Sequence, residues 1–185
     1  MKKIILKFLD ILKAFHTIIW CFFNGVKFKK GVRVGFFVKK KRHVKLILEN
    51  GTLVWNHVMF WGNGTVKIGK KTSIGPNSKI FSSRDGGVEI GSFNNFASDL
   101  YIIDSDHDTS KSIMIGGDNV SRKITIGSKC WIGYHVTILK GVLIADGCVV
   151  GACSLVTKPL PKNTICGGVP ARVLKNRAII NENNN

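Results

Sequence analysis

From residue 126 onward the sequence repeats every six residues, and this period constrains the fold more than any other feature of the chain. Six consecutive hexads read IGSKCW, IGYHVT, ILKGVL, IADGCV, VGACSL and VTKPLP, and each opens with an aliphatic residue. A period of six matches neither the 3.6-residue turn of an α-helix nor the two-residue alternation of an ordinary strand. The repeat itself must therefore be the structural unit.

The hexads predict an all-β fold, a parallel β-helix. Each hexad supplies a short strand and a corner, the aliphatic residue points into a prism-shaped core, and three hexads close one coil. A modest side chain often sits four places after the aliphatic residue, where the interior is narrow, so Cys130 and Cys148 are predicted to be buried structural thiols. The same register recurs over residues 68–80 and 90–102.

Two interruptions break this register. Between Ile80 and Ile90 the chain takes ten residues instead of six, which predicts a small bulge at a corner. A larger gap, at about residues 103–123, carries no convincing hexads and is predicted to leave the prism as an excursion loop. Long loops on rigid scaffolds are commonly functional, and this one holds His107 within the acidic run DSDHD.

Residues 1–30 form a basic segment with apolar residues at helical spacing, which predicts an amphipathic helix. Its apolar side consists of Ile4, Phe8, Ile11, Leu12, Phe15, Ile18, Ile19 and Phe22, and its other side of Lys3, Lys7, Asp10, Lys13 and Thr17. Charged residues interrupt the apolar run, so a membrane span is not expected, and no small-residue cleavage site of a secretory signal follows. Two roles stay open for residues 1–24: packing against the protein or a neighbouring subunit, and peripheral contact with the inner face of a membrane.

The chain carries 28 Lys and Arg against 11 Asp and Glu, a formal net charge of +17. Of these basic residues 13 lie in the first 45 positions, beside a single acid, Asp10. Such a charge favours an anionic partner, such as nucleic acid, an anionic membrane surface or a phosphorylated small molecule. The five cysteines show no CxxC pair and no metal-ligand spacing, so we expect reduced thiols and no metal. Because neither a membrane span nor a cleavable signal is expected, we also expect a cytoplasmic protein.

The C-terminal hexads resemble those of a known enzyme family. The run CWIGYHVTILKGVLIADGCVVGACSLVTKPLPKNTICGGVPARVLK contains the elements WIG, GA-S-VTK and G-x-PAR in that order. Over roughly residues 62–175 the chain resembles the hexapeptide-repeat acyltransferases, and within them the sugar and polysaccharide O-acetyltransferases related to the galactoside and maltose enzymes. The resemblance implies a left-handed β-helix domain at 31–175, a polar tail at 176–185, and a homotrimer with active sites between neighbouring prisms.

The resemblance also implies direct transfer of an acetyl group from acetyl-CoA to a sugar hydroxyl. By position, His107 matches the family's general base, and Asp104 or Asp106 is expected to orient its imidazole. Asn77 falls near a substrate-contacting asparagine of the galactoside branch. The acetyl-CoA contacts carried over by motif fall on Tyr134, Ala152, Thr157, Lys158, Arg172 and Lys175, of which the cations suit the phosphates of CoA.

The acceptor is left open, because the chain has Asp-His-Asp where the sugar acetyltransferases usually show Gly-His-Pro. We expect a saccharide or glycolipid of surface-polysaccharide biosynthesis, with an amino-sugar nitrogen, serine or an antibiotic hydroxyl as alternatives. A hexapeptide carbonic anhydrase would need three metal-binding histidines, and only His107 and His135 lie near the required region. A non-enzymatic basic β-helix is the other rival, but no nucleic-acid partner is expected without a known binding motif.

Overall fold

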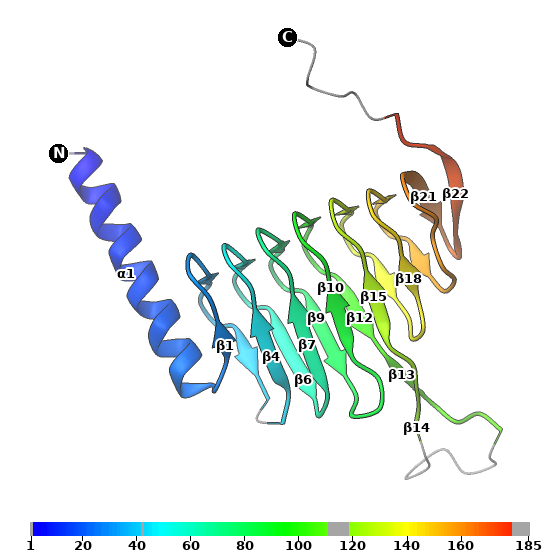
Figure 1. Cartoon of the computed structure of the whole chain (residues 1–185), viewed down its shortest axis with the longest axis horizontal. Coiled ribbons are helices and arrows are strands. Elements are labelled where there is room, and N and C mark those ends of the chain that lie inside the picture. The colour runs from blue at the N-terminus through cyan, green and yellow to red at the C-terminus, as the bar shows by residue number, and fades with distance from the viewer. Residues whose placement is uncertain (1, 42, 111–118, 179–185) are drawn as a thin grey trace.

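The structure, a computed structural model, describes residues 2–41, 43–110 and 119–178, and for residues 2–8 it describes the helical backbone alone. Within these residues one helix, α1 (Lys2–Phe23), precedes a succession of short strands. The strands wind into a three-sided prism, with α1 across one end and the last two strands at the other (Figure 1). The charged residues Lys3 and Lys7 and the apolar residues Ile4 and Phe8 of the predicted amphipathic helix have side chains outside the described set.

Each side of the prism is one sheet, and each coil visits the three sheets in turn. Sheet A consists of β1 (Lys27–Phe28), β4 (Lys45–Leu48), β7 (Thr65–Ile68), β10 (Val88–Ile90), β15 (Ile124–Ile126) and β18 (Leu143–Ile144). Sheet B consists of β2 (Arg33–Val34), β5 (Leu53–Val54), β8 (Ser73–Ile74), β11 (Asn95–Phe96), β16 (Trp131–Ile132), β19 (Val149–Val150), β21 (Thr164–Gly168) and β22 (Ala171–Asn176). Sheet C consists of β3 (Lys39–Lys40), β6 (Met59–Gly62), β9 (Lys79–Ser82), β12 (Tyr101–Ile103), β17 (Thr137–Ile138) and β20 (Leu155–Val156).

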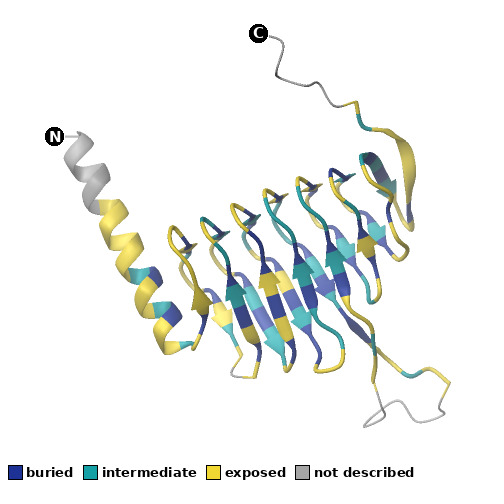
Figure 2. Cartoon of the chain, viewed as in Figure 1, coloured by how far each residue is buried: buried dark blue, intermediate teal, exposed yellow. Residues whose placement is uncertain are grey.

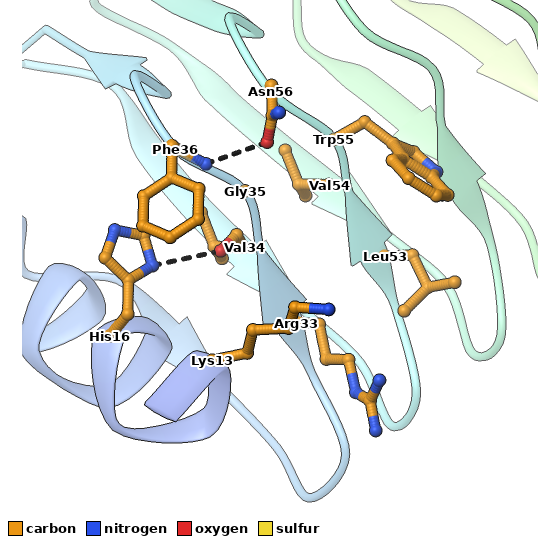
Figure 3. A pocket seen from close by; sticks show the side chains of 10 residues that line it. All are labelled: Lys13, His16, Arg33, Val34, Gly35, Phe36, Leu53, Val54, Trp55 and Asn56. Carbon is orange, nitrogen blue, oxygen red and sulfur yellow. Dashed lines mark hydrogen bonds between the residues drawn. The ribbon is translucent and has the colours of Figure 1, made fainter. Parts of the chain in front are cut away.

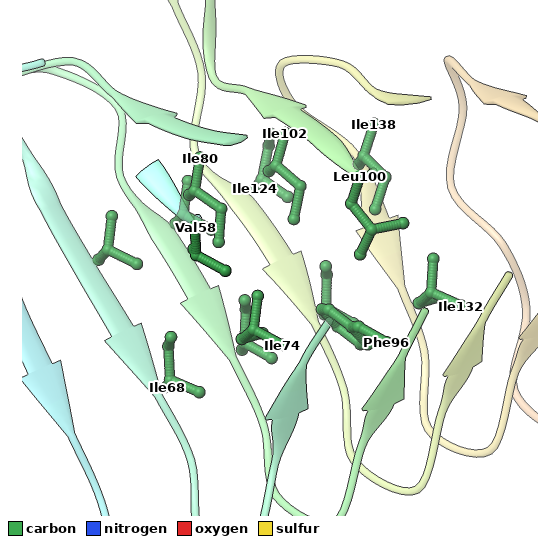
Figure 4. Close-up of a cluster of buried hydrophobic side chains, with 14 of the residues drawn as sticks. Val58, Ile68, Ile74, Ile80, Phe96, Leu100, Ile102, Ile124, Ile132 and Ile138 are labelled. Atoms are coloured by element: carbon green, nitrogen blue, oxygen red, sulfur yellow. The ribbon is translucent and has the colours of Figure 1, made fainter. Parts of the chain in front are cut away.

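The core is a set of columns of aliphatic side chains. In sheet A the residues Ile68, Ile90, Ile126 and Ile144 pair directly from strand to strand, and each is at most 1% exposed. Figure 4 shows isoleucines from all three sides pointing into this common interior. Burying one such side chain contributes roughly 1.5–3 kcal/mol. The predicted interior position of the hexad aliphatics is confirmed, as is the burial of Cys130 and Cys148.

The glycine after the aliphatic residue is required by the close approach of neighbouring coils. A Cβ on Gly91 would lie 2.6 Å from the carbonyl oxygen of Gly127, and one on Gly133 would lie 2.7 Å from the backbone nitrogen of Ala152. Left-handed backbone occurs instead two residues after these glycines, at Phe93 and His135. Gly91 and Gly133 are therefore needed because a side chain would clash with the next coil, whereas the left-handed turn is made by the residues two positions later.

The corners stack into three long edges, two of which matter for the site. Edge BC, between sheets B and C, contains residues 75–78, 133–136 and 151–154. Edge CA, between sheets C and A, contains residues 83–87, 104–110, 119–123, 139–142 and 157–159. Both predicted interruptions fall on edge CA. The bulge lies at 83–87, and the excursion leaves the prism as a hairpin of β13 (Ser105–His107) and β14 (Asn119–Ser121).

The predicted N-terminal helix is confirmed as α1, and the side that packs against the prism is the one that contains Thr17, opposite the predicted apolar side. Thr17 is 2% exposed and Cys21 is fully buried, whereas Phe15 and Phe22 on the opposite side are 62% and 78% exposed. Figure 2 shows the buried residues of α1 only on the side that faces the prism. Among the described residues, no helix combines the length and the hydropathy needed to cross a bilayer.

Candidate active site

His107 is the last residue of β13 and is exposed on the hairpin that leaves edge CA. Its backbone is placed by the antiparallel pairing of β13 with β14, in which His107 lies opposite Asn119. Within the described part of the chain, no hydrogen bond or ion pair engages the imidazole. The side chain is therefore accessible to an acceptor, which is the first requirement for a general base.

Asp104 lies at the root of this hairpin and is fully buried. Its carboxylate accepts hydrogen bonds from the backbone N–H of Ser83, at 2.8 and 3.0 Å, and from the N–H of Gly87. Its own backbone carbonyl accepts a bond from the N–H of Arg122 on the returning strand, at 2.9 Å. Asp104 thus links the bulge of edge CA to the hairpin through hydrogen bonds. Among the described residues, no hydrogen bond joins its carboxylate to His107.

Asp106 points away from His107, because successive side chains of a strand alternate between its two faces. Its carboxylate forms an ion pair with the ammonium of Lys140, which comes from the next coil of edge CA. Asp108 instead accepts two hydrogen bonds from Ser110, from the hydroxyl at 2.7 Å and from the backbone N–H at 3.0 Å, and these lower the pKa of its carboxyl. Over the ranges that the structure describes, no hydrogen bond joins any of the three aspartates to the imidazole of His107, so the orienting role of Asp104 or Asp106 stays a prediction.

Two of the expected acetyl-CoA residues come together in one hollow. Lys158, after β20, and Arg172, on β22, line a depression of about 220 Å³ with Pro159, Leu160 and Val173. Both cations are exposed, and the guanidinium of Arg172 donates to its neighbour's carbonyl oxygen at 3.0 Å. The hollow offers two positive charges beside apolar side chains, which suits a phosphorylated ligand with an apolar arm.

The remaining expected residues are divided between edges. Thr157 is exposed beside Lys158 on edge CA, and Lys175 is exposed on β22 opposite Ile165. Tyr134, 51% exposed, and Ala152, also exposed, lie instead on edge BC. The fold thus places Thr157 and Lys158 on edge CA, Tyr134 and Ala152 on edge BC, and Arg172 and Lys175 on strand β22 of sheet B.

Asn77 also lies on edge BC, where it is exposed and has a φ of 59°. Its backbone N–H donates to the carbonyl oxygen of Asn56 in the preceding coil, at 3.1 Å. Asparagine tolerates this left-handed conformation better than most residues, so the corner by itself accounts for its presence. A role toward substrate stays a prediction.

Three features were missed by the sequence analysis. The first is Lys140, which the sequence does not distinguish from the other lysines of this basic chain. Only the fold shows that it lies beside Asp106. An aromatic cluster lies on sheet C below the hairpin, with the ring centroids of Trp61 and Phe81 5.4 Å apart and those of Trp61 and Tyr101 5.9 Å apart. Trp61 and Phe81 pair directly on neighbouring strands, whereas Tyr101 pairs with Lys79, so the coil repeat alone does not mark the cluster in the sequence.

The third missed feature is a groove between α1 and the first two coils (Figure 3). It has a volume of about 200 Å³ and is mostly apolar. Phe36 and Leu53 form part of its wall, and Lys13 and Arg33 stand at its side. In the described residues, no three His, Cys, Asp or Glu side chains gather in a way that could hold a metal ion.

Residues 123–158 match the family model described as bacterial transferase hexapeptide (six repeats). Galactoside O-acetyltransferase from Escherichia coli (strain K12) is 45% identical over 69 residues, which cover 37% of this chain and 34% of that relative. The chain therefore spans about a third of the length of this relative. The predicted resemblance to the hexapeptide-repeat acyltransferases is confirmed.

Solved structures share the fold. A variant of AntD, an N-acyltransferase from Bacillus cereus, in complex with dTDP and coenzyme A has a TM-score of 0.71 at 23% identity, covering 82% of this chain and 84% of that one. The polySia specific acetyltransferase NeuO has a TM-score of 0.58 at 24% identity, covering 86% and 89%. The predicted left-handed parallel β-helix is confirmed by these likenesses.

Proposed function

We propose that the protein is an acetyl-CoA-dependent O-acetyltransferase, and that its acceptor is a hydroxyl of a saccharide or glycolipid in surface-polysaccharide biosynthesis. The observation that carries this proposal is the arrangement on edge CA. There an exposed histidine, His107, shares one edge of the prism with Lys158, which lines a cationic hollow together with Arg172 of β22. The named activity of the galactoside relative supports both the acetyl donor and the sugar acceptor.

In the proposed reaction His107 accepts the proton of the acceptor hydroxyl as that oxygen attacks the thioester carbonyl of acetyl-CoA. The new C–O ester bond forms, the C–S bond breaks, and the proton passes from the imidazolium to the departing thiolate of CoA. General-base assistance of this kind accelerates a reaction by roughly 10² to 10⁴. Lys158 and Arg172 would meanwhile hold the phosphates of CoA through charge-assisted hydrogen bonds.

We propose further that the working form is a homotrimer. One prism carries Tyr134 and Ala152 on edge BC and His107 and Lys158 on edge CA, so no single chain unites the four. When prisms stand side by side, edge BC of one subunit can face edge CA of the next, and each cleft then contains both groups. An orienting carboxylate for His107 could come from the neighbouring subunit in the same way.

One feature of the fold supports a sugar as the proposed acceptor. The aromatic cluster of Trp61, Phe81 and Tyr101 offers half-buried ring surface beside the hairpin, where the apolar face of a sugar ring could pack. An amine acceptor is the second candidate, because the AntD fold neighbour is an N-acyltransferase. We also propose that the enzyme works in the cytoplasm in peripheral contact with the inner membrane, close to lipid-linked saccharides.

The test combines turnover with cofactor binding. Acetyl transfer is followed by thiol release with a panel of saccharides, lipid-linked saccharides and amino sugars, and acetyl-CoA affinity is measured by calorimetry. We expect His107→Ala to lower kcat by at least about 10² while acetyl-CoA still binds. We expect Arg172→Ala to weaken acetyl-CoA binding about fivefold, the effect of about 1 kcal/mol at an exposed charge pair.

Asp108→Asn is the matched control, since it alters a half-buried residue next to His107 whose hydrogen bonds to described residues stay within its own turn. Its turnover should equal that of the unchanged protein. A His107→Ala enzyme with normal kcat would refute the assignment of the base. Turnover with amino sugars alone would contradict the O-acetyltransferase assignment and support an N-acetyltransferase instead.

A further inference from the structure

The polar side of α1 covers the free edges of the first coil. β2 and β3 are terminal strands of their sheets, so the outer edge of each has no neighbouring strand. The hydroxyl of Thr17 accepts a hydrogen bond from the N–H of Val34 at 3.0 Å, and the indole N–H of Trp20 donates to the carbonyl oxygen of Val38 at 3.0 Å. Because these polar groups are held against the prism, the apolar side of α1 has to face away from it.

That apolar side is extensive and uncovered. It consists of Ile11, Leu12, Phe15, Ile18, Ile19 and Phe22, with exposed fractions between 40% and 78%, and we call it the outer face of α1. In addition, every described residue of α1 before His16 is exposed, so the N-terminal half of the helix has little contact with the prism. Exposed apolar patches of this kind mark interaction sites.

Cations surround this end of the molecule. Each of the three terminal strands carries one that is exposed: Lys27 on β1, Arg33 on β2 and Lys39 on β3. Arg33 pairs with Asp10 at 3.4 Å, but among the described residues no carboxylate pairs with Lys27 or Lys39. An apolar helix face with positive charge around it has the chemistry of a surface that binds anionic lipid headgroups.

We propose that the N-terminal end of the prism docks on an anionic bilayer, with the outer face of α1 lying in the headgroup region and the cations of the first coil against lipid phosphates. Lys13, which is exposed on α1, adds a further cation at this end of the molecule. Docking end-on leaves the sides and edges of the prism free for neighbouring subunits. A second copy is a poorer occupant of the outer face, because two such ends would bring like charges together.

Docking of this kind is independent of the proposed activity, so it can be measured on the full chain without substrate. The assay is cosedimentation with phosphatidylcholine vesicles prepared with and without phosphatidylglycerol. We expect strong binding only when phosphatidylglycerol is present, and weaker binding as NaCl is raised. Phe15→Ser/Ile18→Ser should lower the partition coefficient at least about tenfold, because two large apolar side chains no longer enter the interface.

The matched control is Phe93→Ser/Leu143→Ser, which removes two apolar side chains of similar exposure, 54% and 48%, from corners and strands far from α1. It should bind the vesicles like the unchanged protein. Lys27→Glu/Lys39→Glu should weaken binding by at least about tenfold, at about 1 kcal/mol for each charge lost.

Three results would overturn the proposal. Equal binding by the α1 variant and the control variant would show that the outer face does not contact lipid. Equal binding to vesicles with and without phosphatidylglycerol would remove the role of charge. Dissociation of the oligomer by Phe15→Ser/Ile18→Ser, seen by light scattering, would show that the outer face is a subunit interface. Circular dichroism checks that the variants fold, which is expected because both side chains are exposed.

Discussion

Replacing Asp104 separates a structural role from a catalytic one. The side chain is fully buried and receives the backbone N–H groups of Ser83 and Gly87, while the hydroxyl of Ser82 lies 3.4 Å from it. Asp104→Ala removes the acceptor and leaves one buried and one half-buried backbone donor without a partner. Hydrogen bonds to a charged group contribute about 1.5–3 kcal/mol each, so the variant should lose roughly 3–6 kcal/mol of unfolding free energy.

The loss should be visible as a fall in melting temperature. In a chain of this size about 1 kcal/mol corresponds to 2–4 °C, so Asp104→Ala should melt about 6–24 °C lower. Asp104→Asn keeps one acceptor oxygen but turns an amide N–H toward the other donor, and should lose about half as much. The assay is thermal unfolding followed by circular dichroism, with kcat measured well below the transition.

Asp106→Asn is the matched control, because Asp106 is an exposed acid in the same segment whose ion pair with Lys140 contributes at most about 1 kcal/mol. Its melting temperature should change little. The structural account of Asp104 would be refuted if Asp104→Asn melted like the unchanged protein but had lost its turnover. That result would instead support the prediction that Asp104 orients the imidazole of His107.

Further predictions concern two hexad glycines, the reactivity of the cysteine thiols and the pH dependence of stability. Gly91→Ala should destabilise the fold by roughly 1–3 kcal/mol, because its Cβ would lie 2.6 Å from a carbonyl oxygen. Gly151→Ala is the matched control, because the nearest atom to its Cβ would lie at 3.5 Å, and its stability should be close to that of the unchanged protein. Chemical denaturation measures both. At pH 8, exposed Cys153 should react with a thiol reagent before the buried Cys130, and Cys153→Ser should abolish the fast phase. Burial raises the pKa of Cys130 from 9.0 to about 11, so the stability that this thiol contributes is complete below about pH 9 and declines as the pH rises toward 11. Rapid modification of Cys130 in the folded protein, or equal loss of stability in the two glycine variants, would contradict these expectations.

The hexads by themselves determined the prism, its core and its interruptions. Ile126 and the aliphatic residues that follow it every six positions must occupy the same, inward-facing position of a repeating unit, since a period of six fits neither an α-helix nor an ordinary strand. The position of His107 in the gap between hexads followed from the same period. These inferences hold because a repeat contacts mainly its neighbours, so local sequence and global fold carry the same information.

Only the tertiary structure decided what the acidic and amphipathic segments do. DSDHD places three acids beside one histidine in the sequence, but Asp104 turns inward to the bulge at 83–87 and Asp106 outward to Lys140, because their partners come from other coils. Helical periodicity likewise showed that α1 has two sides without showing which one packs. The choice was made by the unpaired edge of the first coil, whose backbone polar groups need hydrogen bonds that Thr17 and Trp20 can supply and an apolar side chain cannot.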